Sequence, residues 1–206
     1  MLRLIRRSDR DGAMDKKRGG AAWGVCLWGI AIAGMFGAAA GQSSTEQSAG
    51  LFTQMATVLQ GPRCMNCHTN TEFPRQGDDR HRHLMNVMRG DDNRGAAGLH
   101  CNTCHQAANQ AASGVPGAPD WHLAPLKMGW EGLTVSQLCR AISDPAHGGM
   151  KPSQLVAHFN TGLVRWAWTP GVDSHGRART SPPISHEQFI ALTKQWVASG
   201  AECPKP

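Results

Sequence analysis

The sequence contains one short pattern twice: two cysteines separated by two residues and followed directly by a histidine. The copies are Cys64-Met65-Asn66-Cys67-His68 and Cys101-Asn102-Thr103-Cys104-His105, and they start 37 residues apart. Two thiols about one helical turn apart can bond to the two vinyl groups on one edge of a porphyrin, and the adjacent histidine can then bind the iron. The pattern therefore predicts two covalently bound haem c groups, with four cysteine anchors and with His68 and His105 as proximal iron ligands.

Cysteine pairs of this spacing also occur in zinc sites and in thiol redox sites. A zinc site made of the four motif cysteines would have 33 residues between its two pairs, which is longer than the usual spacing, and it would leave both histidines unexplained. A disulfide framework of the same cysteines would close only short loops, which adds little stability. Haem attachment accounts for more of the pattern than either alternative.

The N-terminal segment 1–40 has the composition of an export signal. Seven Lys and Arg residues precede an apolar run from Ala21 to Ala40, and the run ends in small residues that a signal peptidase recognises. Because the run has about 20 residues, an uncleaved membrane anchor is the alternative. In both cases we expect the working part of the chain in the periplasm, where c-type cytochromes receive their haem, with membrane contact only if the segment is retained.

The positive charge of the chain is concentrated in that segment. The formal net charge is +6, but residues 1–40 hold seven basic and three acidic residues and so contribute +4 of it. The remaining chain is nearly balanced, and it gives no reason to expect binding to nucleic acid.

Apolar periodicity in the rest of the chain predicts short helices and few strands. After a polar leader at 41–50, we expect helices at Leu51–Gln60, His81–Met88 and Pro152–Phe159. Two further helices are indicated by capping boxes, at Thr134-Val135-Ser136-Gln137 and at Ser185-His186-Glu187-Gln188.

Long loops and the close spacing of the motifs determine the expected architecture. Gly- and Pro-rich stretches at 114–125 and 169–183 predict surface loops. A separate monohaem domain around each motif would need about twice the 37 residues that are available between them. We therefore predict a single, mainly α, dihaem cytochrome c domain over 51–206, in which short helices and long loops pack around two apolar haem plates. The tryptophans are expected in the core or at porphyrin edges.

The sixth ligand of each iron is a histidine or a methionine that the motifs do not identify. His83 follows the first motif by 15 residues, so we expect it to fold back over the first haem, with His81 as its exposed neighbour. For the second haem the candidates are Met128, His122 and His158.

Three cysteines lie outside the motifs. Cys26 would be lost with a cleaved signal. An oxidising compartment favours a disulfide between Cys139 and Cys203, and two buried free thiols are the alternative.

Further stretches of the chain resemble a known family. They are Gly117-Ala118-Pro119-Asp120-Trp121, Leu123-Ala124-Pro125, Leu163-Val164-Arg165-Trp166-Ala167-Trp168 and the ending Trp196…Gly200-Ala201…Cys203-Pro204. Together with the two haem motifs, they resemble short bacterial dihaem cytochromes c that are often labelled as a subunit of isoquinoline 1-oxidoreductase, a molybdenum hydroxylase. The resemblance implies a redox partner of that class. The sequence itself has no molybdopterin or iron–sulfur motif.

The function expected from these features is electron transfer rather than catalysis. A periplasmic carrier of this kind takes single electrons from a dehydrogenase or hydroxylase and passes them to a downstream acceptor, toward the respiratory chain. The alternative is a haem enzyme similar to dihaem peroxidases, in which one iron keeps an open sixth position. The short chain, which lacks two full haem domains, favours the carrier.

Overall fold

The computed structural model describes residues 43–173 and 175–206, and the expected export segment lies outside them. Over the described residues the chain is mainly helical, as predicted. The α-helices and strands are α1 (Ser44–Leu59), α2 (Pro62–Met65), β1 (Arg75–Gln76), β2 (His81–Arg82), α3 (Val135–Ser143), α4 (Pro152–His158), α5 (Gly162–Arg165) and α6 (His186–Ala198). Single turns of 3₁₀ helix lie between them. Among the described residues, no helix is both long enough and apolar enough to cross a membrane.

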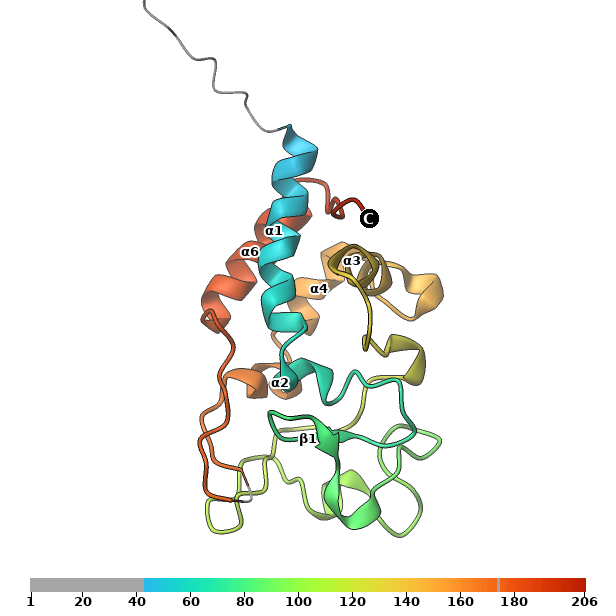
Figure 1. Cartoon of the computed structure of the whole chain (residues 1–206), viewed down its shortest axis with the longest axis vertical. Coiled ribbons are helices and arrows are strands. Elements are labelled where there is room, and N and C mark those ends of the chain that lie inside the picture. The colour runs from blue at the N-terminus through green and yellow to red at the C-terminus, as the bar shows by residue number, and fades with distance from the viewer. Residues whose placement is uncertain (1–42, 174) are drawn as a thin grey trace, which may run out of the picture. The chain divides into compact units, whose positions relative to one another are not determined.

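Helix α1 packs against α6 and anchors the helical part of the domain (Figure 1). A capping box formed by Ser43 and Glu46 starts α1, and the apolar side chains of Phe52 and Met55 are fully buried. Phe52 contacts Trp196 of α6 with ring centroids 5.3 Å apart. Burial of large aromatic side chains of this kind stabilises the helix pair by the hydrophobic effect.

The start of α1 corrects the predicted polar leader at 41–50. The helix begins at Ser44, so residues 44–50 form its first turns and belong to the domain. Ser48 is fully buried, and its hydroxyl accepts hydrogen bonds from the Ser199 hydroxyl and from the backbone N–H of Glu202. These bonds join the start of α1 to the end of α6.

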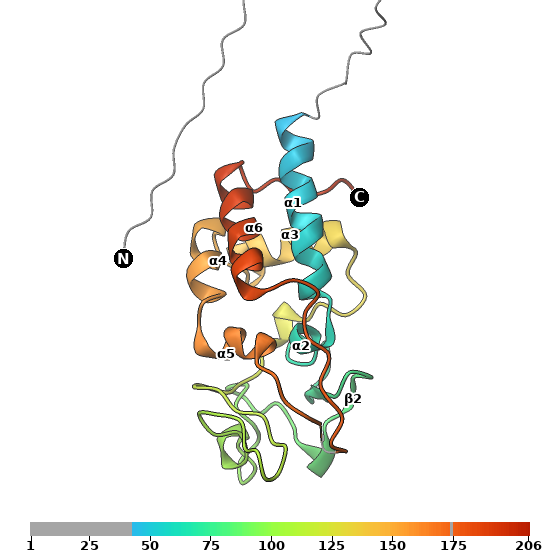
Figure 2. The same ribbon diagram turned by 90° about the vertical axis from the view of Figure 1, so that its left-hand side faces the viewer.

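The later helices agree with the predicted capping signals. The capping boxes of Thr134 with Gln137 and of Ser185 with Gln188 are both formed, and they start α3 and α6. The expected helix at Pro152–Phe159 is α4, which ends one residue earlier, at His158. Helices α1, α3, α4 and α6 lie together at one end of the described domain (Figures 1 and 2).

A disulfide between Cys139 and Cys203 holds the C-terminal segment on α3. Cys139 is fully buried, and the two Cα atoms are 5.6 Å apart. The Ser136 hydroxyl of α3 adds a hydrogen bond to the carbonyl oxygen of Pro204. The cysteines that lie outside both the motifs and the export segment are therefore part of the scaffold.

The structure contradicts the helix predicted at His81–Met88. This stretch contains β2, which pairs antiparallel with β1, and a 3₁₀ turn at Leu84–Asn86. Of the four apolar side chains in this stretch only Val87 is buried, whereas Met85 is 78% exposed and Leu84 53%. Because helices of this length are stabilised mainly by a buried apolar face, the segment has nothing to hold it helical.

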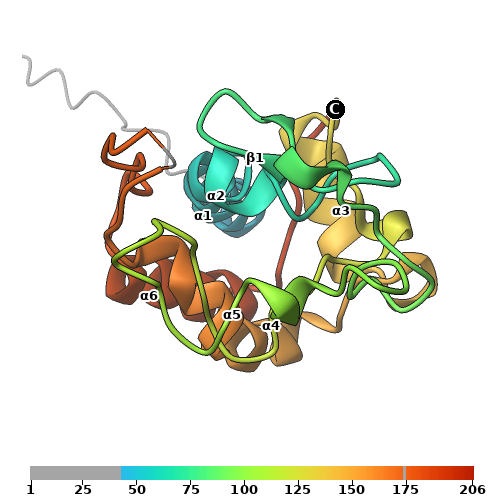
Figure 3. The same cartoon turned by 90° about the horizontal axis from the view of Figure 1, so that it is seen from below.

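Long loops form the end of the described domain away from α1 and α6. The predicted loops at 114–125 and 169–183 contain no α-helix over their described residues. Viewed from the loop end, α2 and β1 lie on one side and α4, α5 and α6 on the other (Figure 3).

We predict that removal of the disulfide lowers the free energy of unfolding by about 4 kcal/mol, because it frees a loop of 64 residues in the unfolded chain. Urea unfolding of Cys203→Ser, followed by circular dichroism, measures the change. The reduced wild-type protein is the control and should unfold at the same urea concentration as the variant. If the variant had the same urea midpoint as the oxidised wild type, the disulfide would add no stability.

Candidate cofactor sites

The first motif lies on a single helical turn that follows α1. Gly61 and Pro62 end one helix and start the next, and Cys64 is in α2. The backbone N–H groups of Cys67 and His68 both donate to the carbonyl oxygen of Cys64, at 3.2 and 3.1 Å, so the turn continues through the motif. The two thiols are therefore one turn apart, which is the spacing that attachment to one porphyrin edge requires.

The second motif forms the same kind of turn within a loop. Cys101 begins a 3₁₀ helix at Cys101–Thr103. Its carbonyl oxygen accepts hydrogen bonds from the backbone N–H groups of Cys104 and His105, at 3.3 and 2.9 Å. The two motifs thus share one local geometry although only the first is joined to a long helix.

His68 is fixed by a hydrogen bond and by stacking. Its Nδ1 donates to the carbonyl oxygen of Met128 at 2.8 Å, and its ring stacks on Trp130 with centroids 3.4 Å apart. Burial lowers the pKa of His68 to about 3, so the imidazole is neutral at neutral pH. With the proton on Nδ1, the lone pair of Nε2 is available to a metal ion.

His105 is held in the same way by different residues. Its Nδ1 donates to the carbonyl oxygen of Pro116 at 2.8 Å, and its ring stacks on Trp121 with centroids 4.4 Å apart and planes within 3° of parallel. Burial also lowers the pKa of His105. In both motif histidines Nδ1 therefore carries the proton, and the lone pair of Nε2 remains available for a metal ion.

The four motif cysteines are free thiols. Burial raises the pKa of Cys64 to about 12 and that of Cys67 to about 11, so both are neutral at neutral pH. Among the described residues, no three or more His, Cys, Asp or Glu side chains are grouped so that they could hold a metal ion. A zinc site made of the four motif cysteines has no support in this arrangement.

Each motif lines its own cavity. The first cavity, about 640 Å³, contains Cys64, Cys67 and His68 on its wall. The second, about 590 Å³, is lined by Cys101, Cys104 and His105. Both volumes are within the range of about 300–1,000 Å³ that is typical of cofactor sites. Apolar side chains from the helices complete the first cavity, among them Leu59, Ile142, Leu155, Phe159 and Phe189.

The two cavities are neighbours with a common wall. Arg63, Cys67, Trp121, His122 and Trp166 line both of them. The rings of Trp121 and Trp166 meet edge to face with centroids 4.8 Å apart. The two groups that these cavities would hold are therefore separated by only a few side chains.

His83 lies in the second cavity, which contradicts its assignment to the first haem. The β1–β2 hairpin carries the chain after the first motif toward the second, so closeness in sequence does not decide the pairing. Its ring centroid is 5.9 Å from that of His105, and its Nδ1 donates to the carbonyl oxygen of Leu84. The two rings meet edge to face, with their planes 70° apart.

Of the three residues predicted for the second haem, only His122 lines the second cavity, and it lines the first as well. Met128 and His158 line the first cavity, and His122 lies on the common wall. Met128 accepts the Nδ1 hydrogen bond of His68, which places its backbone behind that ring and away from a metal at Nε2. Within the described part of the chain, the ring of His158 makes no hydrogen bond to another residue, and burial lowers its pKa. It is therefore a neutral imidazole in the first cavity.

Glu131 ties the loop after the first motif to the hairpin. One carboxylate oxygen accepts from the backbone of Asn70 and the hydroxyl of Thr69, and the other contacts Arg75 and Arg80. Burial alone would raise the pKa of Glu131, but the bond from Asn70 and the two arginine charges outweigh it and lower the pKa.

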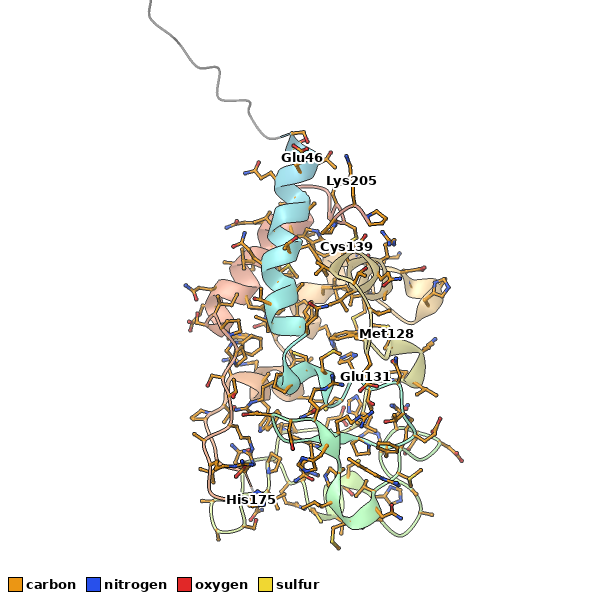
Figure 4. All side chains as sticks on the ribbon, in the orientation of Figure 1. Glu46, Met128, Glu131, Cys139, His175 and Lys205 are labelled. Carbon is orange, nitrogen blue, oxygen red and sulfur yellow. A yellow bond between two sulfur atoms is a disulfide. The ribbon has the colours of Figure 1, made fainter. Side chains whose placement is uncertain are left out.

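Figure 4 shows Met128 and Glu131 between the helical end with Cys139 and the loops with His175.

Arg89 joins three loop segments that have no regular structure. Its guanidinium donates to the carbonyl oxygens of Thr69, Thr71 and Ala124 and to the side chain of Asn93. The residue is only 4% exposed. Neither Arg89 nor the stacking of Trp130 and Trp121 on the motif histidines is indicated by a local sequence pattern.

Comparison of the chain with protein-family models, with curated proteins and with solved structures finds no match. The geometry of the two motif sites is therefore the basis for the function proposed below.

Substitution of Arg89 by Ala should destabilise the loop that follows the first motif and the loops on either side of the second. Each buried carbonyl oxygen left without a donor costs about 1–3 kcal/mol, so the free energy of unfolding should fall by at least about 2 kcal/mol. Urea unfolding measures the loss. Arg82→Ala, at an exposed position, is the matched control and should change stability by less than about 1 kcal/mol. Equal effects of the two substitutions would contradict the role given to Arg89.

Proposed function

We propose that this protein is an exported dihaem c-type cytochrome that carries electrons between a donor enzyme and a downstream acceptor. The observation that supports this most strongly is the pairing of two motif turns with two adjoining apolar cavities. In each cavity a neutral motif histidine offers Nε2 and two thiols stand one turn apart.

Haem bound in these sites supplies a one-electron Fe(III)/Fe(II) couple. The chain supplies the rest of the centre. Cys64 and Cys67 would hold one haem through thioether bonds, each S–H adding across one vinyl double bond of the porphyrin, and Cys101 and Cys104 would hold the other. His68 and His105 provide proximal nitrogens held in a fixed tautomer by the carbonyl oxygens of Met128 and Pro116.

The common wall of the two cavities would allow electron transfer between the two haems. An electron that arrives at one centre has to pass only the side chains between the two cavities, of which Trp121 and Trp166 are the largest. The apolar side chains on the first cavity wall exclude water, which limits the reorganisation that accompanies a change of charge. The protein adjusts the potential of each centre through the sixth ligand and the burial of the haem.

The proposed donor is a periplasmic dehydrogenase or hydroxylase, and its proposed class, a molybdenum hydroxylase, follows from the family resemblance. The proposed acceptor leads toward the respiratory chain. In this role the protein is a redox subunit or partner without a substrate of its own.

The number of covalent haems per chain, in the wild type and after loss of either cysteine pair, tests this function directly. We expect the protein, produced in a host that matures c-type cytochromes, to carry two covalent haems per chain and to give sharp low-spin bands in a reduced-minus-oxidised spectrum. The paired variant Cys101→Ala/Cys104→Ala should retain one haem, and so should Cys64→Ala/Cys67→Ala. A wild-type protein that contains metal without haem would refute the proposal. A high-spin iron that binds cyanide would favour a haem enzyme.

The sixth ligands can be assigned by substitution. We expect His83→Ala to convert only the haem of the second motif to high spin, and His158→Ala to convert only that of the first, because each removes the imidazole that faces one cavity. His147→Ala, at an exposed position outside both cavities, is the control. Electron paramagnetic resonance of the oxidised protein reports the spin states. Low-spin signals that survive in both variants would show that other residues, such as Met150, bind the irons.

A further inference from the structure

Arg63 is a buried cation on the common wall of the two cavities. It is 8% exposed, and it directly precedes the first motif cysteine. Its Nε and one terminal nitrogen donate to the carbonyl oxygens of Thr180 and Thr169, at 2.9 and 3.3 Å. The other terminal nitrogen is buried and has no hydrogen-bond partner within the described part of the chain.

A second arginine lies beside it. Arg179 lines the second cavity and donates to the carbonyl oxygen of Gly114. Both guanidinium groups lie near the Trp166 ring, with their carbon atoms 4.8 Å from the ring centroid for Arg63 and 6.0 Å for Arg179. Burial, together with repulsion from Arg179, lowers the pKa of Arg63.

The nearby carboxylates are engaged elsewhere. Asp78 accepts hydrogen bonds from the backbone and the hydroxyl of Thr180, and Asp173 pairs with Arg177 at 2.8 Å. Among the described residues, no carboxylate lies within ion-pairing distance of Arg63 or Arg179. Arg63 is buried and Arg179 is half-buried, and two adjacent cations without an ion pair are costly to desolvate even in part unless an anion joins them.

We propose that Arg63 and Arg179 bind a propionate carboxylate of the haem in the second cavity. The inference rests on the proposed haem binding and adds the residues that would hold the acidic edge of that haem. A guanidinium group matches a carboxylate in shape and charge, and one terminal nitrogen of Arg63 has no other hydrogen-bond partner among the described residues. The second cavity is assigned because both arginines line it.

The proposal has an electrostatic consequence. Two guanidinium charges beside the haem disfavour its more positive, oxidised state, so they raise the reduction potential of that centre. Because Arg63 also bonds to the carbonyl oxygens of Thr169 and Thr180, the same residue would fasten the loop at 169–183 over the haem edge.

The test uses the full dihaem protein and two readouts. In Arg63→Gln, the equilibrium constant for reduction of the second-motif haem against a mediator should fall about tenfold, which is the size expected for loss of one partly buried charge. The propionate bending band in the resonance Raman spectrum should shift as the hydrogen bond is lost. Arg179→Gln should change both readouts in the same direction. Arg63→Lys keeps the charge but not the guanidinium fork. It should therefore shift the Raman band and lower the equilibrium constant by much less than tenfold.

The control is Arg165→Gln, which removes the same charge from an exposed position and should leave both readouts unchanged. The proposal is overturned if the folded Arg63→Gln protein keeps the wild-type equilibrium constant and Raman band. If that variant fails to fold, Arg179→Gln decides by the same measurements. A wild-type Raman band typical of solvent-exposed propionates would also overturn it, even with two haems bound, whereas absence of haem from the wild type would instead refute the proposed function.

Discussion

The arrangement of both sites depends on one hydrogen bond per motif, from the histidine Nδ1 to a backbone carbonyl oxygen outside the motif. For His68 the acceptor is Met128, and for His105 it is Pro116. Each bond fixes the ring, selects its tautomer and directs Nε2 away from the acceptor. A tryptophan ring stacked on the face of each imidazole also holds it in place. Without these contacts, the motif turns would place the thiols but not the metal-binding nitrogens.

The helical end of the domain holds the chain that enters the first motif. Helix α1 leads directly into α2 and is packed on α6, while the disulfide to Cys203 holds the C-terminal segment on α3. The second motif lies among loops, whose positions depend on polar contacts such as the Arg89 network and on the contacts of Trp121. A bound haem would add a large apolar surface to this part, which is consistent with a domain that has few strands and short helices.

The sequence predicted helix starts and the Cys139–Cys203 disulfide correctly, but not which cavity His83, Met128 and His158 line. The capping boxes at Thr134 and Ser185 marked helix starts correctly because capping is a local interaction. The helix predicted at His81–Met88 was wrong because three of its four apolar residues face solvent, which a pattern of residue types does not reveal. His83 was assigned to the nearer motif, whereas the hairpin carries it to the second cavity. The stacked tryptophans and Arg63 could not be found from the sequence, since their partners are far away along the chain.

The central claim, that each motif histidine binds one iron in its own cavity and that the cavities adjoin, can be tested by crystallography of the matured protein. An anomalous difference map recorded at the iron absorption edge locates the metal without any assumption about ligands. The account predicts two iron peaks, one beside Nε2 of His68 and one beside Nε2 of His105. A single peak, or a metal bound between the cysteine pairs with no iron signal, would contradict it.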